Sequence, residues 1–203
     1  MSASQHRAGR RTAVLLIDVI NAFDFEGASA LIRGARRASI RIDTLCRRAR
    51  ELHLPIIYVN DNFGRWRSDF ATTIRECTKP GLPGRDVCER LRPLPGDYFI
   101  LKPLHSGFYS TPLELLLRHL GIQSLILTGF AANICLLFTA NDARMRGYRL
   151  VVPRDCTAAN SPPLARGALS HIRTVLGGDV RLSSDVDFDA LEHQRKKRRD
   201  QTL

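Results

Sequence analysis

One stretch decides the fold of this chain: Leu125-Ile126-Leu127-Thr128-Gly129-Phe130-Ala131-Ala132-Asn133-Ile134-Cys135. Its pattern predicts a buried strand, a tight turn and the first turn of a helix that carries a thiol. The first residues of a helix have unpaired N–H groups and the positive end of the helix dipole, which favour a thiolate and can bind an oxyanion. A free cysteine is also common as a small, inert packing residue. Position alone therefore leaves Cys135 as either a nucleophile or a packing residue.

Two other apolar strands end in charged residues. Asp18 follows the run 13–17, and Lys102 closes the run 98–102. Each charge alone is consistent with a solvated strand end. However, the carboxyl ends of parallel strands line one crevice, so a carboxylate, an ammonium and a thiol are predicted to meet there. Nucleophilic catalysis requires this combination: a thiol, a base for its proton and a cation that keeps the base ionised.

These residues lie in motifs that resemble a known family. The motifs are the segments 15–23, 102–111 and 128–135, followed by Thr139-Ala140-Asn141-Asp142-Ala143 and Gly147-Tyr148. They resemble the isochorismatase-like cysteine hydrolases, a family that includes nicotinamidases, N-carbamoyl amidohydrolases and ureidoacrylate-type amidohydrolases. The likeness runs from about residue 12 to about residue 160, with the motifs in the family's order.

The resemblance implies a catalytic triad of Asp18, Lys102 and Cys135. In that scheme Asp18 takes the thiol proton, Lys102 keeps Asp18 ionised, and the thiolate attacks a carbonyl carbon. The backbone N–H groups of Ala131 and Cys135 would form the oxyanion hole, with a cis peptide at Phe130–Ala131. The implied reaction hydrolyses a non-peptide C–N bond, in an amide, carbamoyl or ureido group of a small molecule, through a thioester on Cys135. No cofactor is required.

Two other functions stay open. Isochorismatases of the same superfamily hydrolyse a vinyl ether without needing the cysteine, and a non-catalytic binding or scaffold protein would need no triad. The presence of Cys135 in an otherwise matching motif favours C–N hydrolysis, and the retention of all three triad residues argues against a scaffold. The sequence does not identify the substrate.

The loops that follow the strands, at about 19–29, 60–70 and 103–110, are expected to shape the substrate pocket. Relatives often have Tyr where this chain has His105 and Ala where it has Gly107, so both residues are expected to tune the pocket. His105 is either a polar wall residue or a proton carrier, and Trp66 is either a pocket or a packing residue. The predicted substrate-binding side chains are Phe23, Phe25, Trp66, His105, Phe108 and Phe130.

The residues after the second strand bear on metal binding. Nicotinamidases of this family bind a metal through an Asp followed two residues later by a His, with further His residues nearby. Here Phe63 follows Asp61, and no His occurs between His53 and His105. The sequence therefore predicts no metal site, and it weakens the case for nicotinamide as substrate.

The 203-residue chain has 44% hydrophobic and 25% charged residues, as expected for one soluble globular domain. Strands that alternate with helices predict a parallel sheet covered on both faces. The resemblance implies a three-layer α/β/α sandwich, isochorismatase-like and Rossmann-like, with a mostly parallel sheet of about six strands, and self-association into dimers or tetramers. The expected strands are 12–18, 56–60, 98–102, 124–128, 149–153 and a short last strand at 180–182.

Three parts are expected along the chain: a flexible basic arm at 1–11, a single hydrolase domain at 12–190 and a basic, disordered tail at 191–203. The net charge is +11, and the densest basic run is Arg195-Lys196-Lys197-Arg198-Arg199. This run has no interleaved aromatic residue of the kind on which single-stranded nucleic acids stack. We therefore expect a solvated tail, with nucleic-acid contact as the less favoured alternative.

The chain's compartment is expected to be the cytoplasm. No apolar run approaches the roughly 20 residues of a membrane span, and the N-terminus lacks the apolar core of a secretory signal. The five cysteines are odd in number and have no C-x-x-C spacing. Neither a disulfide framework nor a zinc finger is indicated, so a reducing environment fits best.

Overall fold

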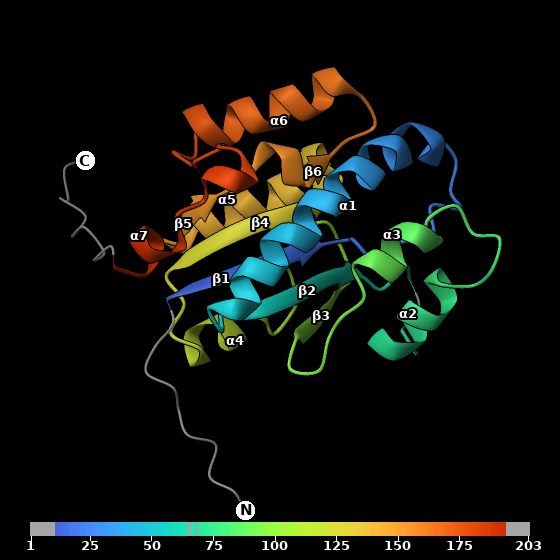
Figure 1. Ribbon diagram of the computed structural model, residues 1–203, viewed down its shortest axis with the longest axis horizontal. Helices are drawn as coiled ribbons and strands as arrows, with labels where there is room; N and C mark the ends of the chain where they lie inside the picture. The colour runs from blue at the N-terminus through green and yellow to red at the C-terminus, as the bar shows by residue number, and fades with distance from the viewer. Residues whose placement is uncertain (1–10, 65, 68, 194–203) are drawn as a thin grey trace, which may run out of the picture.

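A parallel sheet forms the centre of the computed structural model, which describes residues 11–64, 66–67 and 69–193. The order along the sheet is β3-β2-β1-β4-β5, with β6 also paired to β4, and every strand pair is parallel. The predicted α/β class with a sheet of about six strands is confirmed (Figure 1). The strands are β1 (Thr12–Ile17), β2 (Ile56–Asp61), β3 (Tyr98–Lys102), β4 (Ser124–Phe130), β5 (Arg149–Val151) and β6 (Thr157–Ala158).

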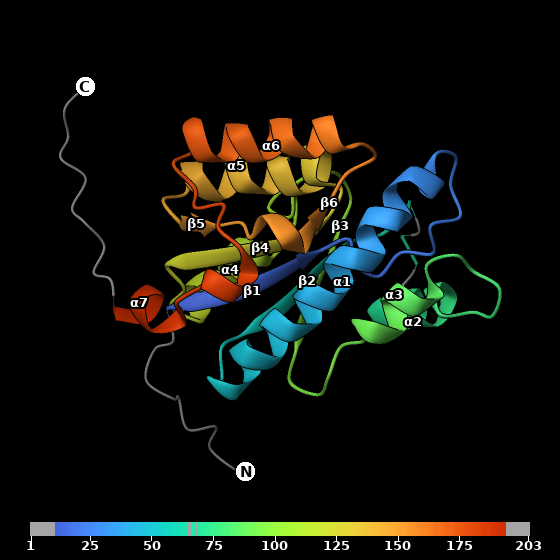
Figure 2. The same cartoon turned by 45° about the horizontal axis from the view of Figure 1, so that its top comes forward.

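Helices cover both faces of this sheet. Figure 1 shows α1 lying across one face and α4 on the opposite face, and Figure 2 shows α6 beside α5. The helices are α1 (Ala28–Glu51), α2 (Phe70–Cys77), α3 (Arg85–Arg90), α4 (Leu113–His119), α5 (Leu137–Met145), α6 (Pro162–Thr174) and α7 (Phe188–His193).

The continuous apolar run of β1 serves both layers of the core. Val14 and Leu16 pack on the face covered by α1 and α3, whereas Leu15 and Ile17 pack on the face covered by α4 and α5. Successive side chains of a strand point to opposite faces, so a strand buried on both sides must be apolar at every position. This arrangement leaves only the ends of the strands for polar side chains.

The long helix α1 follows its predicted apolar stripe. Its buried positions include Leu31, Ala35, Ile42 and Leu45, at steps of three and four residues or their sums. Arginines occupy much of the outer face, and one of them, Arg36, pairs with Asp86 of α3 at 3.0 Å. Most of the positive charge on this helix is therefore directed to solvent, away from the core.

The predicted last strand at 180–182 is wrong. The sixth strand is instead β6, where Thr157 and Ala158 pair with Gly129 and Phe130 of β4. Two residues are too few to show a period of two in the sequence, so this strand left no pattern to read. The apolar character of Val180 has another cause, since this residue packs against the core face that contains Leu150.

The two ends of the described part of the chain lie close together. The backbone N–H of Arg11 donates to the carboxylate of Glu192 at 3.0 Å, which links the start of β1 to α7. The predicted tail begins within α7, and its remainder, 194–203, lies outside the described residues, as does the predicted arm at 1–10. Among the helices that the structure describes, none has both the length and the apolar character needed to cross a membrane.

Candidate active site

Asp18, Lys102 and Cys135 meet at the carboxyl edge of the sheet. Asp18 directly follows β1, Lys102 is the last residue of β3, and Cys135 lies in the turn after β4. The Nζ atom of Lys102 lies 3.0 Å from Asp18 Oδ2 and 3.5 Å from Cys135 Sγ. The lysine side chain is 0% exposed, so its ammonium finds its partners inside the protein. The structure thus brings together the three side chains predicted from the strand ends.

The backbone of Asp18 aims its carboxylate toward the neighbouring strands. Its φ of 52° is left-handed, a conformation that Asp adopts more readily than most residues. The N–H of Asp18 donates to Val59 O at 3.0 Å, and Oδ1 accepts the N–H of Asp61 at 2.7 Å. One carboxylate oxygen is therefore held by β2, and the other faces Lys102.

Gly129 allows β4 to approach the end of β1. Its φ is +114°, and a Cβ at this position would lie 2.1 Å from Ile17 O. Only glycine accepts both this backbone conformation and this close contact without displacement. Glycine at position 129 therefore sets the distance between the strand that leads to Asp18 and the turn that leads to Cys135.

The turn that carries Cys135 differs from the predicted α-helical start. Residues 132–136 form a π-helical turn, in which Leu136 N–H donates to Ala131 O at 3.3 Å, five residues earlier. The peptide between Phe130 and Ala131 is cis, as the resemblance implied. Helix α5 follows directly, so Cys135 lies in the widened turn before the regular helix.

A hydroxyl connects this turn to the loop after β3. Thr139 Oγ1 donates to Cys135 O at 2.7 Å and accepts the N–H of Gly107 at 3.0 Å. The expected pocket role of Gly107 is not supported, because a Cβ there would meet Val59 Cγ1 at 2.7 Å, in the core. The glycine is required for packing against β2, and it lets the loop lie close to the sheet.

The protonation of the site differs from the sequence-based expectation. The pKa of the Cys135 thiol is raised to about 12, mainly by burial and then by the carboxylate of Asp18, while Lys102 opposes the rise. Burial also raises the pKa of Asp18, against the lowering effects of Lys102 and of a hydrogen bond with Cys135. The prediction that the helix start favours a thiolate is therefore wrong for the resting protein. Desolvation and the Asp18 carboxylate disfavour the thiolate, so the sulfur holds its proton at neutral pH.

The ammonium of Lys102 stays charged despite its burial. Burial alone would lower the pKa of Lys102, but Asp18, Cys135 and Asp61 together raise it. A buried ammonium between carboxylates keeps its proton because its loss would leave anions without a counter-charge. The site therefore combines a neutral thiol, a fixed cation and a carboxylate that can take a proton.

Two polar residues at the end of β2 were missed as parts of this site. Asp61 Oδ2 lies 3.3 Å from Lys102 Nζ, so the ammonium has a second carboxylate partner. Asn60 is fully buried, and its side chain bonds both the N–H and the carbonyl of Ile20, at 3.1 and 2.8 Å. The strand-end argument that selected Asp18 would also have selected Asp61.

His105, one of the predicted pocket residues, lies close to the thiol. Its Nδ1 atom is 3.9 Å from Cys135 Sγ, and its ring centroid is 5.5 Å from that of Phe138 on α5. Both rings are exposed to solvent. A polar wall beside the sulfur fits this placement, and the choice between wall and proton carrier stays a prediction.

The predicted aromatic residues separate into two groups. Phe23 is 2% exposed and packs against Phe130, with ring centroids 6.0 Å apart, while Phe108 is buried between Tyr148 and the guanidinium of Arg146. Such buried rings offer almost no surface to a ligand, so this placement does not support the substrate-binding roles predicted for Phe23, Phe108 and Phe130. They were selected because they lie within the motifs, and residues that only pack in the core lie within the motifs as well.

The other two aromatic residues remain accessible. Phe25 lines a cavity of about 330 Å³ with Phe63, between the loops after β1 and β2 and the α2 region. Trp66 is 80% exposed and lies in the loop after β2. Their contact with a substrate stays a prediction, and the cavity makes Phe25 the better supported of the two.

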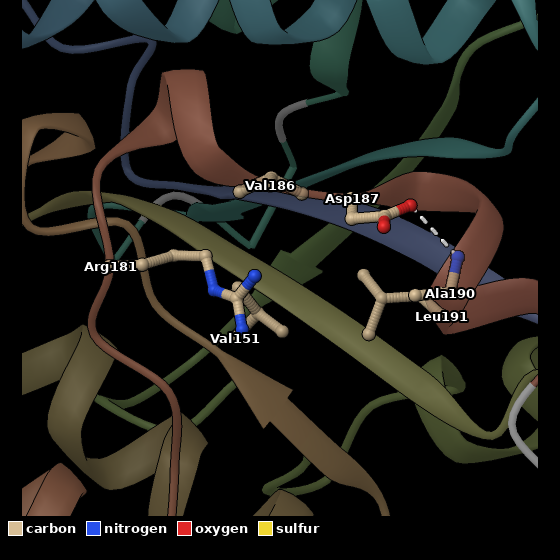
Figure 3. A pocket seen from close by; sticks show the side chains of 6 residues that line it. All are labelled: Val151, Arg181, Val186, Asp187, Ala190 and Leu191. Carbon is tan, nitrogen blue, oxygen red and sulfur yellow. Dashed lines mark hydrogen bonds between the residues drawn. The ribbon is translucent and has the colours of Figure 1, made fainter.

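A smaller hollow lies elsewhere. Its volume is about 40 Å³, and it lies between β5 and the carboxyl-terminal segment. Figure 3 shows Arg181 beside Val151, and Asp187 near Leu191. The volume of the hollow suits one or two water molecules, and its lining contains no thiol. This hollow is separate from the side chains that surround Cys135.

The residues at the end of β2, where metal-binding relatives have their ligands, are not arranged to bind a metal ion. Within 11–64, 66–67 and 69–193, no group of three or more His, Cys, Asp and Glu side chains is placed to hold a metal ion. Asp61 directs one oxygen to Lys102 and the other to the N–H of Phe63, at 2.6 Å. The residues at this position thus do not fit a metal, in line with the sequence, and the absence of a metal stays a prediction.

Comparison with known proteins identifies the family. Residues 12–183 match the family profile described as Isochorismatase domain. The chain belongs to the isochorismatase family. It is 38% identical to the uncharacterized isochorismatase family protein YaaI of Bacillus subtilis over 174 residues, which cover 86% of this chain and 95% of YaaI. The resemblance noted in the sequence is thereby confirmed, and the protein is an isochorismatase-like hydrolase.

Other members of the isochorismatase family resemble the chain over most of its length. The ureidoacrylate amidohydrolase RutB of Cronobacter sakazakii is 30% identical over 201 residues, with 84% of each chain covered. The crystal structure of N-carbamoylsarcosine amidase from Thermoplasma acidophilum superposes with a TM-score of 0.69 at 29% identity, covering 88% of this chain and 99% of that one. These relatives are amidohydrolases by name, and the fold they share with this chain is the predicted one.

Proposed function

We propose that this isochorismatase-family hydrolase cleaves a non-peptide C–N bond of a small molecule, in an amide, carbamoyl or ureido group, through a thioester on Cys135. The observation that carries the proposal is the position of Lys102 Nζ, 3.0 Å from Asp18 Oδ2 and 3.5 Å from Cys135 Sγ. A thiol, a base and a cation in contact are what attack on a carbonyl carbon requires. The names of the amidohydrolase relatives support the choice of bond.

The first half-reaction begins from the protonated thiol. As the sulfur forms its bond to the carbonyl carbon, the thiol proton passes to the Asp18 carboxylate and the carbonyl π electrons move to oxygen. When the oxyanion collapses, the C–N bond breaks, and the proton on Asp18 goes to the departing nitrogen. Ammonia or an amine leaves, and the acyl group stays on Cys135 as a thioester.

The second half-reaction regenerates the thiol. Asp18 takes a proton from water as the hydroxide oxygen attacks the thioester carbon, and the C–S bond then breaks. The proton returns from Asp18 to the sulfur, so the sum is one water consumed for each C–N bond cleaved. Lys102 keeps its proton throughout and stabilises whichever of Asp18 and Cys135 carries the negative charge.

The oxyanion is assigned to the backbone N–H groups of Ala131 and Cys135. Ala131 is the residue just before the π-helical turn between β4 and α5, and Cys135 lies within that turn. Removal of one oxyanion-hole donor lowers the rate by about 10²- to 10³-fold. No cofactor takes part in the proposed reaction.

The rival reaction on the same fold is hydrolysis of a vinyl ether. It would not need a nucleophilic sulfur, so it leaves the contact between Lys102 and Cys135 without a purpose. A non-catalytic scaffold would likewise leave a buried ammonium among three ionisable partners unexplained, since burying charges without use is costly.

The test is a substrate screen with the purified chain. N-carbamoyl amino acids, ureido acids, primary amides and a vinyl ether such as isochorismate are compared for release of ammonia, amine or alcohol product. We expect C–N cleavage, a covalent acyl adduct on Cys135 by intact-mass measurement, and loss of both in Cys135→Ala. Equal vinyl-ether hydrolysis by the wild-type and Cys135→Ala proteins, without any C–N cleavage, would favour the rival.

We also propose that the protein works in the cytoplasm as a dimer or tetramer and that its ligand is a small molecule. Light scattering during size-exclusion chromatography tests the assembly, and a monomer at micromolar concentration would contradict it. Binding of the tail to nucleic acid stays the less favoured alternative.

A further inference from the structure

The ammonium of Lys102 has two carboxylate partners that differ in their surroundings. Asp18 is 9% exposed at its side chain, whereas Asp61 is 30% exposed. The distances from Nζ are 3.0 Å to Asp18 Oδ2 and 3.3 Å to Asp61 Oδ2. The proposed mechanism uses Asp18 and leaves Asp61 without a role.

Asp61 is connected to the site by three contacts. Its backbone N–H donates to Asp18 Oδ1 at 2.7 Å, and its Oδ1 accepts the N–H of Phe63 at 2.6 Å. Its Oδ2 faces Lys102. The first contact belongs to the backbone and survives any substitution except proline. The side chain therefore has two separable tasks, a local turn at Phe63 and a contact with the cation.

We propose that Asp61 is a positioning residue for the hydrolase, which holds the Lys102 ammonium between two carboxylates so that Asp18 shares the cation and keeps the strength of a base. This inference rests on the proposed function. It gives a role to the carboxylate that, in metal-binding relatives, precedes a His by two residues, and that here precedes Phe63. The side chain that would bind a metal there is committed to Lys102 instead.

The physical argument is one of shared charge. A cation paired with a single buried carboxylate stabilises its ionised form strongly and makes it a poor proton acceptor. A second carboxylate on the same cation reduces that stabilisation, and it adds one negative charge near the thiol. Asp18 then accepts the thiol proton more readily during attack, while the ammonium remains in place to stabilise the developing anion.

The substitution Asp61→Asn separates the two tasks. Asn keeps an Oδ1 atom that can accept the Phe63 N–H, and it replaces the oxygen that faces Lys102 by an uncharged group. Asp61→Ala removes both contacts. Asp43→Asn is the matched control, since Asp43 forms an ion pair with Arg47 at 3.0 Å on the exposed side of α1.

The first measurement is the rate of Cys135 alkylation by iodoacetamide as a function of pH, which needs no substrate. Removing a negative charge near the thiol favours the thiolate, so Asp61→Asn is expected to label about threefold faster or more at pH 8. Asp61→Ala should show the same increase with a lower melting temperature, and Asp43→Asn should match the wild-type protein.

The second measurement is the pH dependence of kcat for whichever substrate the screen identifies. The acid limb should move to lower pH in Asp61→Asn, and kcat should fall about tenfold, because Asp18 becomes a weaker base. A role limited to the Phe63 turn would lower stability in Asp61→Ala without moving either pH profile in Asp61→Asn.

The two proposals fail in different ways. An alkylation profile unchanged in Asp61→Asn would overturn the role of Asp61, and so would a stoichiometric Zn²⁺ or Fe²⁺ that binds the wild-type chain but not this variant. A third outcome is also distinguishable: Asp61→Asn labels faster, but the wild-type protein cleaves no C–N bond. That result would keep the role of Asp61 toward the thiol and reject the proposed reaction.

Discussion

Two cysteines follow neighbouring strands of the sheet, and only one of them has the partners of a nucleophile. Cys135 lies in the turn after β4, and Cys156 ends the 3₁₀ turn Arg154–Cys156 after β5. Burial raises the pKa of both thiols. The raised pKa and the position after a strand are therefore common to both cysteines and do not distinguish the nucleophile.

Their neighbours do. Cys135 is partly exposed, and Lys102 lies 3.5 Å from its sulfur. Cys156 is 0% exposed, and the nearby carboxylate of Asp155 is occupied by the N–H and hydroxyl of Ser183, at 2.8 and 2.7 Å. A nucleophilic thiol thus needs solvent access, an available base and a counter-charge together. A cysteine that merely follows the end of a strand, without these partners, remains a packing residue.

The sharpest test of this difference is removal of each thiol. Cys135→Ala should lower turnover on the order of 10⁴-fold or more, since the covalent path is lost, with the free energy of unfolding changed by no more than about 0.5 kcal/mol. Turnover and denaturant unfolding of the two alanine variants give the comparison. If Cys156→Ala lost activity and Cys135→Ala kept it, the assignment would be reversed.

The variant Asp18→Asn tests whether the Cys135 thiol, with its raised pKa, needs Asp18 as a base for turnover. Turnover should fall by roughly 10²- to 10⁴-fold, the usual contribution of a general base. Yet alkylation of Cys135 at a fixed pH should become faster, because the Asp18 carboxylate raises the pKa of the thiol and its removal lowers that pKa. A parallel fall in both rates would mean that Asp18 mainly supports the fold.

The same residue sets the pH dependence of the wild-type protein. Burial raises the pKa of Asp18 above its ordinary value of 3.8, so the base becomes protonated at a higher pH than an exposed Asp would. Turnover should therefore fall as the pH decreases through this raised pKa, and recover above it. A pH profile of kcat/KM that stayed flat down to pH 4 would be inconsistent with Asp18 as the base.

Lys102 is the partner that Cys156 lacks. Lys102→Met keeps the approximate length of the side chain and removes the charge, so the pKa of Cys135 should rise by about a unit or more and turnover should fall about 10²- to 10³-fold. Lys102→Arg restores charge with a planar fork and should be intermediate in labelling but poor in rate. The measurement is iodoacetamide labelling against pH, and an unchanged profile in Lys102→Met would separate the lysine from the thiol.

Cys156 should matter only for packing. Cys156→Ala removes a sulfur from a fully buried position and should cost about 1 kcal/mol in the free energy of unfolding, with kcat unchanged. Urea denaturation and turnover on the same preparation check both halves. A large loss of turnover at full stability would show that this turn takes part in catalysis.

The smallest expected effect is that of metal removal. Because Asp61 faces Lys102 and the Phe63 N–H, treatment with a chelator should leave turnover unchanged within error. Elemental analysis before and after treatment provides the check, and one metal per chain that leaves together with activity would contradict this prediction.

The sequence by itself determined the class of fold and the three side chains that meet at its edge. Continuous apolar runs and the stripe of α1 are local patterns, and they predict strands and helices without knowledge of their neighbours. Asp18, Lys102 and Cys135 were found because parallel strands end on one side, a rule that needs only the strand boundaries. Asp61 obeys the same rule and was overlooked because it was weighed only as a metal ligand.

Only the tertiary structure decided the state of the thiol and the lining of the site. The first turn of a helix predicted a thiolate at Cys135, but its pKa depends on burial and on Asp18, which comes from a strand more than a hundred residues away in sequence. Phe23 and Phe130 lie within motifs, yet packing places both rings in the core. The two-residue strand β6 exists because β4 offers Gly129 and Phe130 as partners. Desolvation, packing and strand pairing join distant parts of the chain, so no local pattern records them.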